Sequence, residues 1–232
     1  VALELRGKAG PVLVQGSHLL VAAGRKTNTA GLGLDLAGIE VTPRGITVDQ
    51  RLRSSNRRVF AIGDVAGGPQ FTHIAGYHAG IVIRNALFGL PAKVAYAARP
   101  WVTSADPELA HVGLTEAEAR AAGHDVSTLL QPLAGNDRAK AERASDGLTK
   151  LILGPRGRLL GATILAPHAG EMIGIWGLAI QQKMKIGAIA SMILPYPTMS
   201  EISKRAAGCF YTPSLFSTRT RRLVGLLQRW LP

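Results

Sequence analysis

The sequence is poor in cysteine, in aromatic residues and in acidic residues, and it lacks long apolar runs. The single cysteine, Cys209, excludes an intramolecular disulfide or a paired-thiol redox centre, and it suits a reducing compartment such as the cytoplasm. Aromatic residues make up 5% of the chain, and the 27 Lys and Arg residues come with no recognisable nucleic-acid-binding module, so the net charge of +12 does not predict nucleic acid binding. No apolar run approaches the roughly 20 residues that cross a bilayer.

What the sequence does contain is enough apolar material for two ordinary domains with true cores. The chain has 232 residues, of which 47% are hydrophobic and 18% charged, so it is globular rather than disordered. It begins at Val1 instead of Met, and no signal peptide is visible. We therefore expect a piece of a longer protein.

The pattern at residues 58–89 predicts a strand, a loop and a helix. The apolar run 59–62 reads as a buried strand that breaks at Gly63 and Asp64. A helix follows, with Thr72 as its expected cap, and its apolar positions recur at helical spacing: Ile74, Tyr77, Ile81 and Val82. Gly89 and Pro91 mark its far end.

Asp64 would then lie at the carboxyl edge of a strand, where open α/β sheets hold ligands. Its carboxylate can accept hydrogen bonds from sugar-type hydroxyls, and the helix start near Thr72 and His73 offers a positive end to an electron-rich group. This pair suits a nucleotide cofactor. The alternative is an ordinary Gly-Asp turn after a strand.

The residues before this stretch predict short strands and turns. Residues 1–10 read as a polar edge strand, and 18–23 as a buried strand. The glycines of 31–38 lack the G-x-G-x-x-G spacing, so we interpret that segment as a structural turn. A hairpin is expected between 39–42 and 46–49.

A linker is expected at 90–99, and the pattern beyond it predicts an α+β domain with an antiparallel sheet covered by helices. Thr115 and Glu118 form the signature of a capping box at a short helix. The expected strands are 101–105, 109–113, 126–133, 148–153 and 159–165, and the later helices are 168–183, 186–192 and 198–210.

The motif at 195–201, PYPTMSE, is the most distinctive local feature of the second half. Pro197 restricts Tyr196 to an extended conformation, and the bond between them is a plausible cis peptide. Thr198 is expected to cap the next helix, with Glu201 completing a capping box. From the residues alone, Glu201 is as well explained by this structural role as by a catalytic one.

Other candidate groups favour structural roles. His168 and Glu171 lie one helical turn apart, but no third ligand has suitable spacing, so we predict no metal site. His73 and His78 are expected to contribute to packing. Cys209 is expected to be a buried, inert thiol, with a reactive thiol as the alternative.

The chain ends in a basic amphipathic tail, residues 213–232. After Glu201 the sequence has no acidic residue, whereas six basic residues follow: Lys204, Arg205, Arg219, Arg221, Arg222 and Arg229. Leucines and Trp230 form an apolar stripe at helical spacing, ending with Leu231. The stripe favours docking on the protein itself or a partner subunit, and the alternative is an anionic membrane surface.

Taken together, the motifs LLVAAGR, VFAIGDV, PWVTSADPELAHVGLTEAEARAAG and LLGATILAPHAGEMI resemble the C-terminal half of class I pyridine nucleotide–disulfide oxidoreductases, dihydrolipoamide dehydrogenase-like or mercuric reductase-like flavoproteins. The resemblance implies α/β remnants of the NAD(P)-binding domain (1–28) and the FAD-binding domain (29–93). An interface domain with an antiparallel sheet (94–212) would follow. It also implies FAD contacts from Asp64, Phe71, Thr72 and His73, with NAD(P)H as electron donor.

The resemblance further implies a homodimer through 94–212, with Tyr196 and Glu201 as catalytic residues beside the partner's flavin. The family's G-x-G-x-x-G loop and Cys-x4-Cys pair are absent here, so we expect the missing N-terminal domains to supply them and the fragment alone to be inactive. Tyr196 stands where disulfide reductases carry a His, which favours a mercuric-reductase-like enzyme. A non-catalytic dimerisation module is the alternative.

Overall fold

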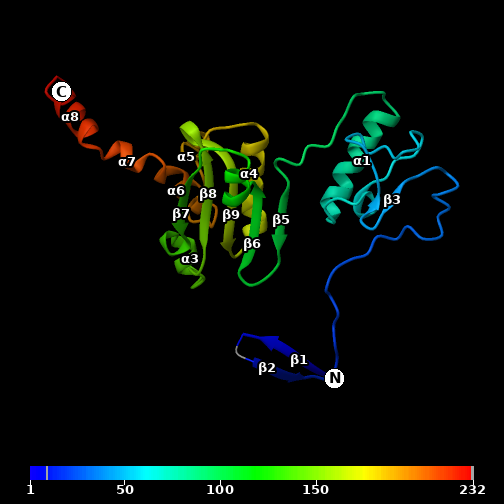
Figure 1. The fold of residues 1–232 in the computed structure, drawn as a ribbon. Coiled ribbons are helices and arrows are strands. Elements are labelled where there is room, and N and C mark those ends of the chain that lie inside the picture. Colours follow the sequence, from blue (N-terminus) through cyan, green and yellow to red (C-terminus); the bar gives the residue numbers. More distant parts are fainter. Residues whose placement is uncertain (9, 231–232) are drawn as a thin grey trace. The chain divides into compact units, whose positions relative to one another are not determined.

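The structure, a computed structural model, describes residues 1–8 and 10–230 (Figure 1). The chain divides into an N-terminal unit, Val1–Val94, and a C-terminal unit, Ala95–Pro232. Across the described residues, no helix combines the length and the apolar character needed to span a bilayer.

The C-terminal unit is built on a five-stranded sheet in which every neighbouring pair is antiparallel (Figure 1). This confirms the predicted sheet. The strand order is β5-β6-β9-β8-β7, and the strands are β5 (Pro100–Thr103), β6 (Glu108–Gly113), β7 (Ser127–Pro132), β8 (Leu148–Gly154) and β9 (Arg158–Ala166). The register pairs Ala110 with Ile164 and Leu151 with Ala162, which places apolar side chains on one face.

Helices lie between and after the strands of this sheet, and the start of α2 agrees with the local sequence. The predicted capping box at Thr115 and Glu118 is present in both directions at the start of α2. The remaining helices follow or interrupt the strands: α2 (Glu116–Ala121), α3 (Asp137–Ala141), α4 (Ala169–Gln181), α5 (Ile186–Ala190), α6 (Glu201–Cys209), α7 (Thr212–Leu215) and α8 (Thr218–Leu227), with 3-10 turns η2 (Leu133–Gly135) and η3 (Pro155–Gly157).

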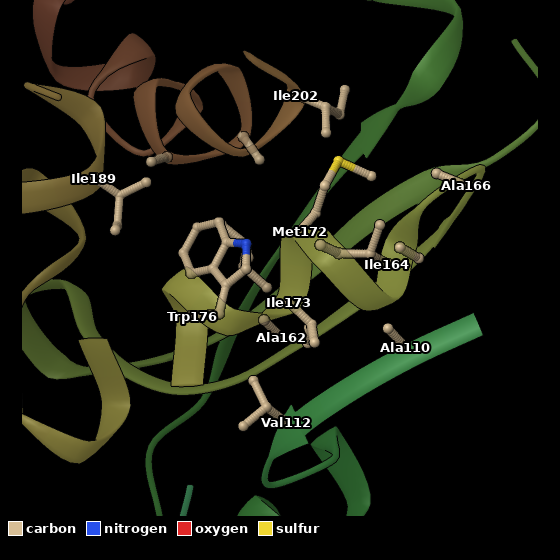
Figure 2. Close-up of a cluster of buried hydrophobic side chains, with 14 of the residues drawn as sticks. Ala110, Val112, Ala162, Ile164, Ala166, Met172, Ile173, Trp176, Ile189 and Ile202 are labelled. Atoms are coloured by element: carbon tan, nitrogen blue, oxygen red, sulfur yellow. The ribbon is translucent and has the colours of Figure 1, made fainter. Parts of the chain in front are cut away.

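The main core lies between the sheet and helices α4, α5 and α6. Trp176 of α4 is fully buried there, and Figure 2 shows its indole among Val112, Ile173, Ile189 and Ile202. Its Nε1–H donates a hydrogen bond to Ser203 Oγ at 3.1 Å, so the polar edge of the ring is satisfied. The core therefore combines side chains of the sheet with side chains of the three helices that follow it in the sequence.

The N-terminal unit contains one long helix and small sheets. Its elements are β1 (Ala2–Gly7), β2 (Gly10–Gln15), β3 (Val41–Thr42), β4 (Gly45–Ile46), the 3-10 turn η1 (Gly63–Ala66) and α1 (Thr72–Ala86). The hairpin predicted around 43–45 is confirmed as β3 and β4. Two small clusters hold the unit, one around Ile39, Ile46 and Ala61, the other around Leu52, Ile81 and Ala92.

The polar edge strand predicted at residues 1–10 is present as β1, over Ala2–Gly7, and it pairs with β2. Two other strand predictions in this unit are wrong. Residues 18–23 form no strand, and Leu20 is 89% exposed. Residues 59–62 form no regular strand either, since only Phe60 makes an isolated bridge, to Arg53. A strand needs a neighbour with free backbone groups, and the described residues place no such strand beside either segment.

Candidate functional site

The first candidate site is the turn at Gly63 and Asp64, which the structure places in η1 rather than after a regular strand. Gly63 has φ of 66°, and a Cβ at this position would come within 3.0 Å of the Ala75 Cβ of α1. The left-handed conformation and the close approach of the helix both require glycine here. This contact sets Asp64 beside the start of α1.

Asp64 presents a partly exposed carboxylate, with 40% of its side chain accessible. Arg25 Nη1 donates to Asp64 Oδ2 at 3.3 Å and to the Gln70 carbonyl oxygen at 3.4 Å. Arg25 therefore joins the acidic turn to the segment that enters α1. No pattern in the sequence predicts this contact, because 39 residues separate Arg25 from Asp64.

The start of α1 carries the other residues that we expected at a cofactor. Phe71 is the N-cap residue and Thr72 the first helical residue, so the prediction that Thr72 caps the helix is wrong. The rings of Phe71 and His73 stack with centroids 5.1 Å apart. The helix end thus offers an aromatic pair beside its positive backbone terminus.

His78 is a second partner of the acidic turn. Its ring is buried, and its Nδ1 accepts a hydrogen bond from Gly63 N at 3.0 Å. Burial lowers the pKa of His78 below its ordinary value, which favours the neutral ring that this hydrogen bond requires. His78 was expected only to pack, and its hydrogen bond to the turn was not predicted.

The second candidate site is the segment from Pro195 to Glu201, in the C-terminal unit. The bond between Tyr196 and Pro197 is cis, as the sequence indicated. Tyr196 is 68% exposed, and its hydroxyl donates to Asp137 Oδ2 at 3.2 Å. The charge of Asp137, together with this hydrogen bond, raises the pKa of Tyr196 above its ordinary value of 10.0. The phenol is therefore protonated near neutral pH.

Asp137 also attracts two cations. Arg205 Nη2 lies 3.6 Å from its Oδ2 and Lys140 Nζ 3.7 Å from its Oδ1. Arg205 donates in addition to the Gly135 carbonyl oxygen at 2.6 Å. The Tyr196 hydroxyl is thus held in a small charged cluster that joins α3 to α6.

Asn136 anchors the same segment from below the surface. Its buried Nδ2 donates to the carbonyl oxygens of Thr198 at 3.0 Å and Met199 at 3.4 Å, and its Oδ1 accepts from Ala139 N at 2.9 Å as the N-cap of α3. The amide therefore ties the start of one helix to the approach of another. Its capping role was readable from Asn before a short helix, but its contact across 62 residues was not.

The expected capping box at Thr198 is only half present. Glu201 Oε2 accepts from Thr198 N at 3.4 Å, but the Thr198 hydroxyl donates to the Pro195 carbonyl oxygen instead. Ser200, not Thr198, is the N-cap residue of α6. Glu201 thus makes one long bond to the backbone, and its carboxylate contributes to raising the pKa of Tyr196.

The remaining candidate residues are His168, Glu171 and Cys209. His168 is the N-cap residue of α4, with Glu171 in the first turn. Within the described part of the chain, His, Cys, Asp and Glu side chains nowhere gather in threes as a metal site would need. The Cys209 thiol is partly buried and donates to Gln131 Oε1 at 3.1 Å.

Comparison with known proteins gives two family matches in chain order. Residues 3–79 match the family described as pyridine nucleotide-disulphide oxidoreductase, and residues 99–207 match the dimerisation domain of that family. The chain belongs to the pyridine nucleotide-disulphide oxidoreductases. The resemblance seen in the sequence is therefore confirmed.

Similar proteins include a mercuric reductase of Bacillus cereus, 38% identical over 212 residues, which are 90% of this chain and 33% of the relative. A dihydrolipoyl dehydrogenase of Geobacillus stearothermophilus is 42% identical over 196 residues, 84% of this chain and 42% of the relative. The chain thus spans less than half of these relatives' length. The HOCl-induced flavoprotein disulfide reductase RclA of Escherichia coli has a similar structure, with a TM-score of 0.77, 30% identity, and coverage of 88% of this chain and 47% of that chain.

The chain's own residues fit part of a flavin site. Asp64 supplies a partly exposed carboxylate, the acceptor that a polyhydroxylated chain requires, and the start of α1 lies beside it. Phe71 and His73 add stacked rings at the same place. These residues are thus compatible with binding part of FAD.

Proposed function

We propose that this chain is the C-terminal part of an FAD-dependent, NAD(P)H-linked oxidoreductase that works in the cytoplasm as a homodimer. Residues 1–28 would close the NAD(P)-binding domain, 29–93 would complete the FAD-binding domain, and 94–212 would form the dimer. The observation that carries this proposal is the pair of family matches in order, with Asp64 beside the start of α1. The missing N-terminal domains would be the partners of the N-terminal unit.

In this proposal FAD supplies the hydride-accepting chemistry when bound. Asp64 would accept hydrogen bonds from hydroxyl groups of the cofactor, beside the Arg25 guanidinium that already donates to its carboxylate. Phe71, Thr72 and His73 would offer the positive end of α1 to an electron-rich ring. His78 acts indirectly. Its ring accepts a hydrogen bond from the Gly63 amide and so holds the turn that carries Asp64.

Tyr196 and Glu201 would be the catalytic residues of the dimer's shared site. The raised pKa of Tyr196 keeps its phenol protonated, so the side chain acts as a hydrogen-bond donor and not as a base near pH 7. Glu201 holds the backbone of the segment at Thr198. A neutral donor suits an acceptor that needs no proton shuttle, which favours a metal-thiolate acceptor, as in a mercuric-reductase-like enzyme, over dihydrolipoamide.

The test uses the full-length protein. We expect a yellow protein that NAD(P)H reduces, with Tyr196→Phe lowering kcat about tenfold, the loss that corresponds to one good hydrogen bond. Tyr211→Phe is the matched control, because its ring lies elsewhere on the unit, beside Phe210. Tyr196→His should raise turnover of dihydrolipoamide. A colourless protein that cannot be reconstituted with flavin would refute the proposal and leave a non-catalytic dimerisation module.

A further inference from the structure

The helix α8 buries none of its residues, and neither does the short helix α7 that precedes it. Ser217 caps it by accepting from Thr220 N at 3.2 Å, so the helix has a proper start. None of its residues is buried, and Trp230, just beyond its end, is 83% exposed. An amphipathic helix normally forms because one face packs against something. Within the described residues, the apolar face of α8 has no such cover.

Three leucines of α8, with Trp230 just beyond its end, form an apolar stripe. Leu223, Leu226, Leu227 and Trp230 recur at spacings of three and four, so they share one face, and all four are exposed. Leu215 and Phe216, which precede the helix, are exposed as well. Leu231, which the sequence added to the stripe, lies outside the described residues. The stripe thus presents large apolar side chains and an indole, the ring typical of a membrane interface.

The charge around the stripe has one sign. Arg222 lies on the side of α8 next to the stripe, Arg229 follows the end of the helix, and Arg219 and Arg221 add two more cations within it. No acidic residue follows Glu201 anywhere in the sequence. The surface that fits this helix is therefore apolar and negatively charged.

Charge also favours an anionic surface over a second copy of this chain as the cover of α8. The chain carries a net charge of +12, so another copy repels the arginines. Six of its 15 acidic residues already form ion pairs within the chain: Glu4, Asp49, Asp64, Glu116, Asp137 and Glu142. An anionic bilayer offers both requirements at once, since it has dense negative charge above an apolar interior.

We propose that α8, with Trp230, is a peripheral membrane anchor that lies in the interface of an anionic bilayer. Its ten residues span about 15 Å, too short to cross a membrane but long enough to lie along its surface. This inference goes beyond the proposed function and does not depend on it. A chain without flavin chemistry would still bind the same surface.

The test measures co-sedimentation of the 232-residue chain with vesicles of phosphatidylcholine alone or with added phosphatidylglycerol. We expect binding that requires the anionic lipid and weakens as salt is raised. Each basic residue near such a surface is worth about a fivefold change in affinity, so the variant Arg221→Gln, Arg222→Gln, Arg229→Gln should bind about 100-fold more weakly. A second variant, Leu223→Gln with Leu226→Gln, should also lose most of the binding because it removes the stripe.

The matched control removes three exposed charges from the N-terminal unit, by Arg57→Gln, Arg58→Gln and Lys93→Gln, and should bind as the unchanged chain does. Trp230 fluorescence should shift to the blue on binding, and Trp230→Phe should abolish the shift while binding persists. Equal binding by the unchanged chain and the tail variants would overturn the proposal. The proposal would also be overturned if binding did not depend on the anionic lipid and the tail variants sedimented, without vesicles, at a lower mass than the unchanged chain. That outcome would assign the stripe to a contact with a second copy of the chain.

Discussion

The two units of this chain differ in how much of their architecture they complete. The C-terminal unit pairs all five strands in one sheet and buries a continuous core around Trp176. The N-terminal unit has two-stranded sheets and two small clusters, and apolar segments such as residues 18–23 lie exposed. The same kind of sequence, a short apolar run, therefore becomes a strand in one unit and an extended segment in the other.

The difference shows that an apolar run specifies a strand only together with its neighbours. Residues 159–165 lie between β6 and β8, which satisfy both edges of β9. Residues 59–62 have only the segment around Arg53 beside them. We infer that the stability of the chain resides mainly in the C-terminal unit, and four predictions can break or sharpen that contrast.

The largest effect is expected from Trp176→Ala. Truncation of a fully buried Trp creates a cavity, leaves Ser203 without its donor, and should lower the free energy of unfolding of the C-terminal unit by about 3–5 kcal/mol. Denaturant unfolding followed by far-UV circular dichroism measures the loss. Leu20→Ala, at a position 89% exposed in the N-terminal unit, is the control and should change stability by no more than about 0.5 kcal/mol. Similar losses for both would contradict the contrast.

A smaller effect, confined to the N-terminal unit, is expected from His78. His78→Leu leaves the Gly63 amide without its acceptor and should cost about 1–3 kcal/mol, whereas His78→Asn keeps an acceptor and should cost less. Hydrogen exchange at Gly63 reports the change locally. Unaltered exchange at Gly63 in the Leu variant would show that the hydrogen bond does not hold the turn.

The same histidine predicts a pH dependence. Its pKa is lower in the folded chain than in the unfolded one, so its contribution to stability is complete above the unfolded pKa of about 6.5 and is lost as pH falls through the folded pKa. Below about pH 6.5 the protection factor of the Gly63 amide, its slowing relative to an unprotected amide at the same pH, should therefore fall. In His78→Asn this fall should disappear, and its persistence would point to another group.

The smallest effect on stability is expected from Asp137→Asn, at the surface of the C-terminal unit. The ion pairs to Arg205 and Lys140 are exposed, so the stability change should stay below about 1 kcal/mol. The pKa of Tyr196 should nevertheless fall toward 10.0, because Asp137 is the main cause of its rise. Ultraviolet titration of the phenolate, with Tyr196→Phe subtracted, measures this shift. Asp146→Asn, another exposed carboxylate, should leave it unchanged.

Local features of the fold were readable from the sequence. The capping box is predicted by Thr115 and Glu118, which lie within four residues of each other. The alternation of apolar residues likewise indicates the strands of the sheet. The strands expected at 18–23 and 59–62 failed because no local signal reveals whether a neighbouring strand is available. Thr72 and Thr198 failed as caps because a threonine near a helix start does not determine which residue takes the N-cap conformation.

The candidate sites show the same limit. Asp64 and Tyr196 stood out through their local motifs and the family resemblance. Their partners Arg25 and Asp137 did not, because they lie 39 and 59 residues away, and nothing in the sequence marks which distant side chain approaches. Long-range hydrogen bonds become visible only when the chain is folded.

The buried amide of Asn136 has one more consequence. It donates hydrogen bonds to the carbonyl oxygens of Thr198 and Met199 in the segment 195–201, and every amino acid has such a backbone oxygen. These hydrogen bonds therefore do not depend on which side chains that segment carries. The side chain at position 196 can therefore be exchanged without removing either of these two hydrogen bonds.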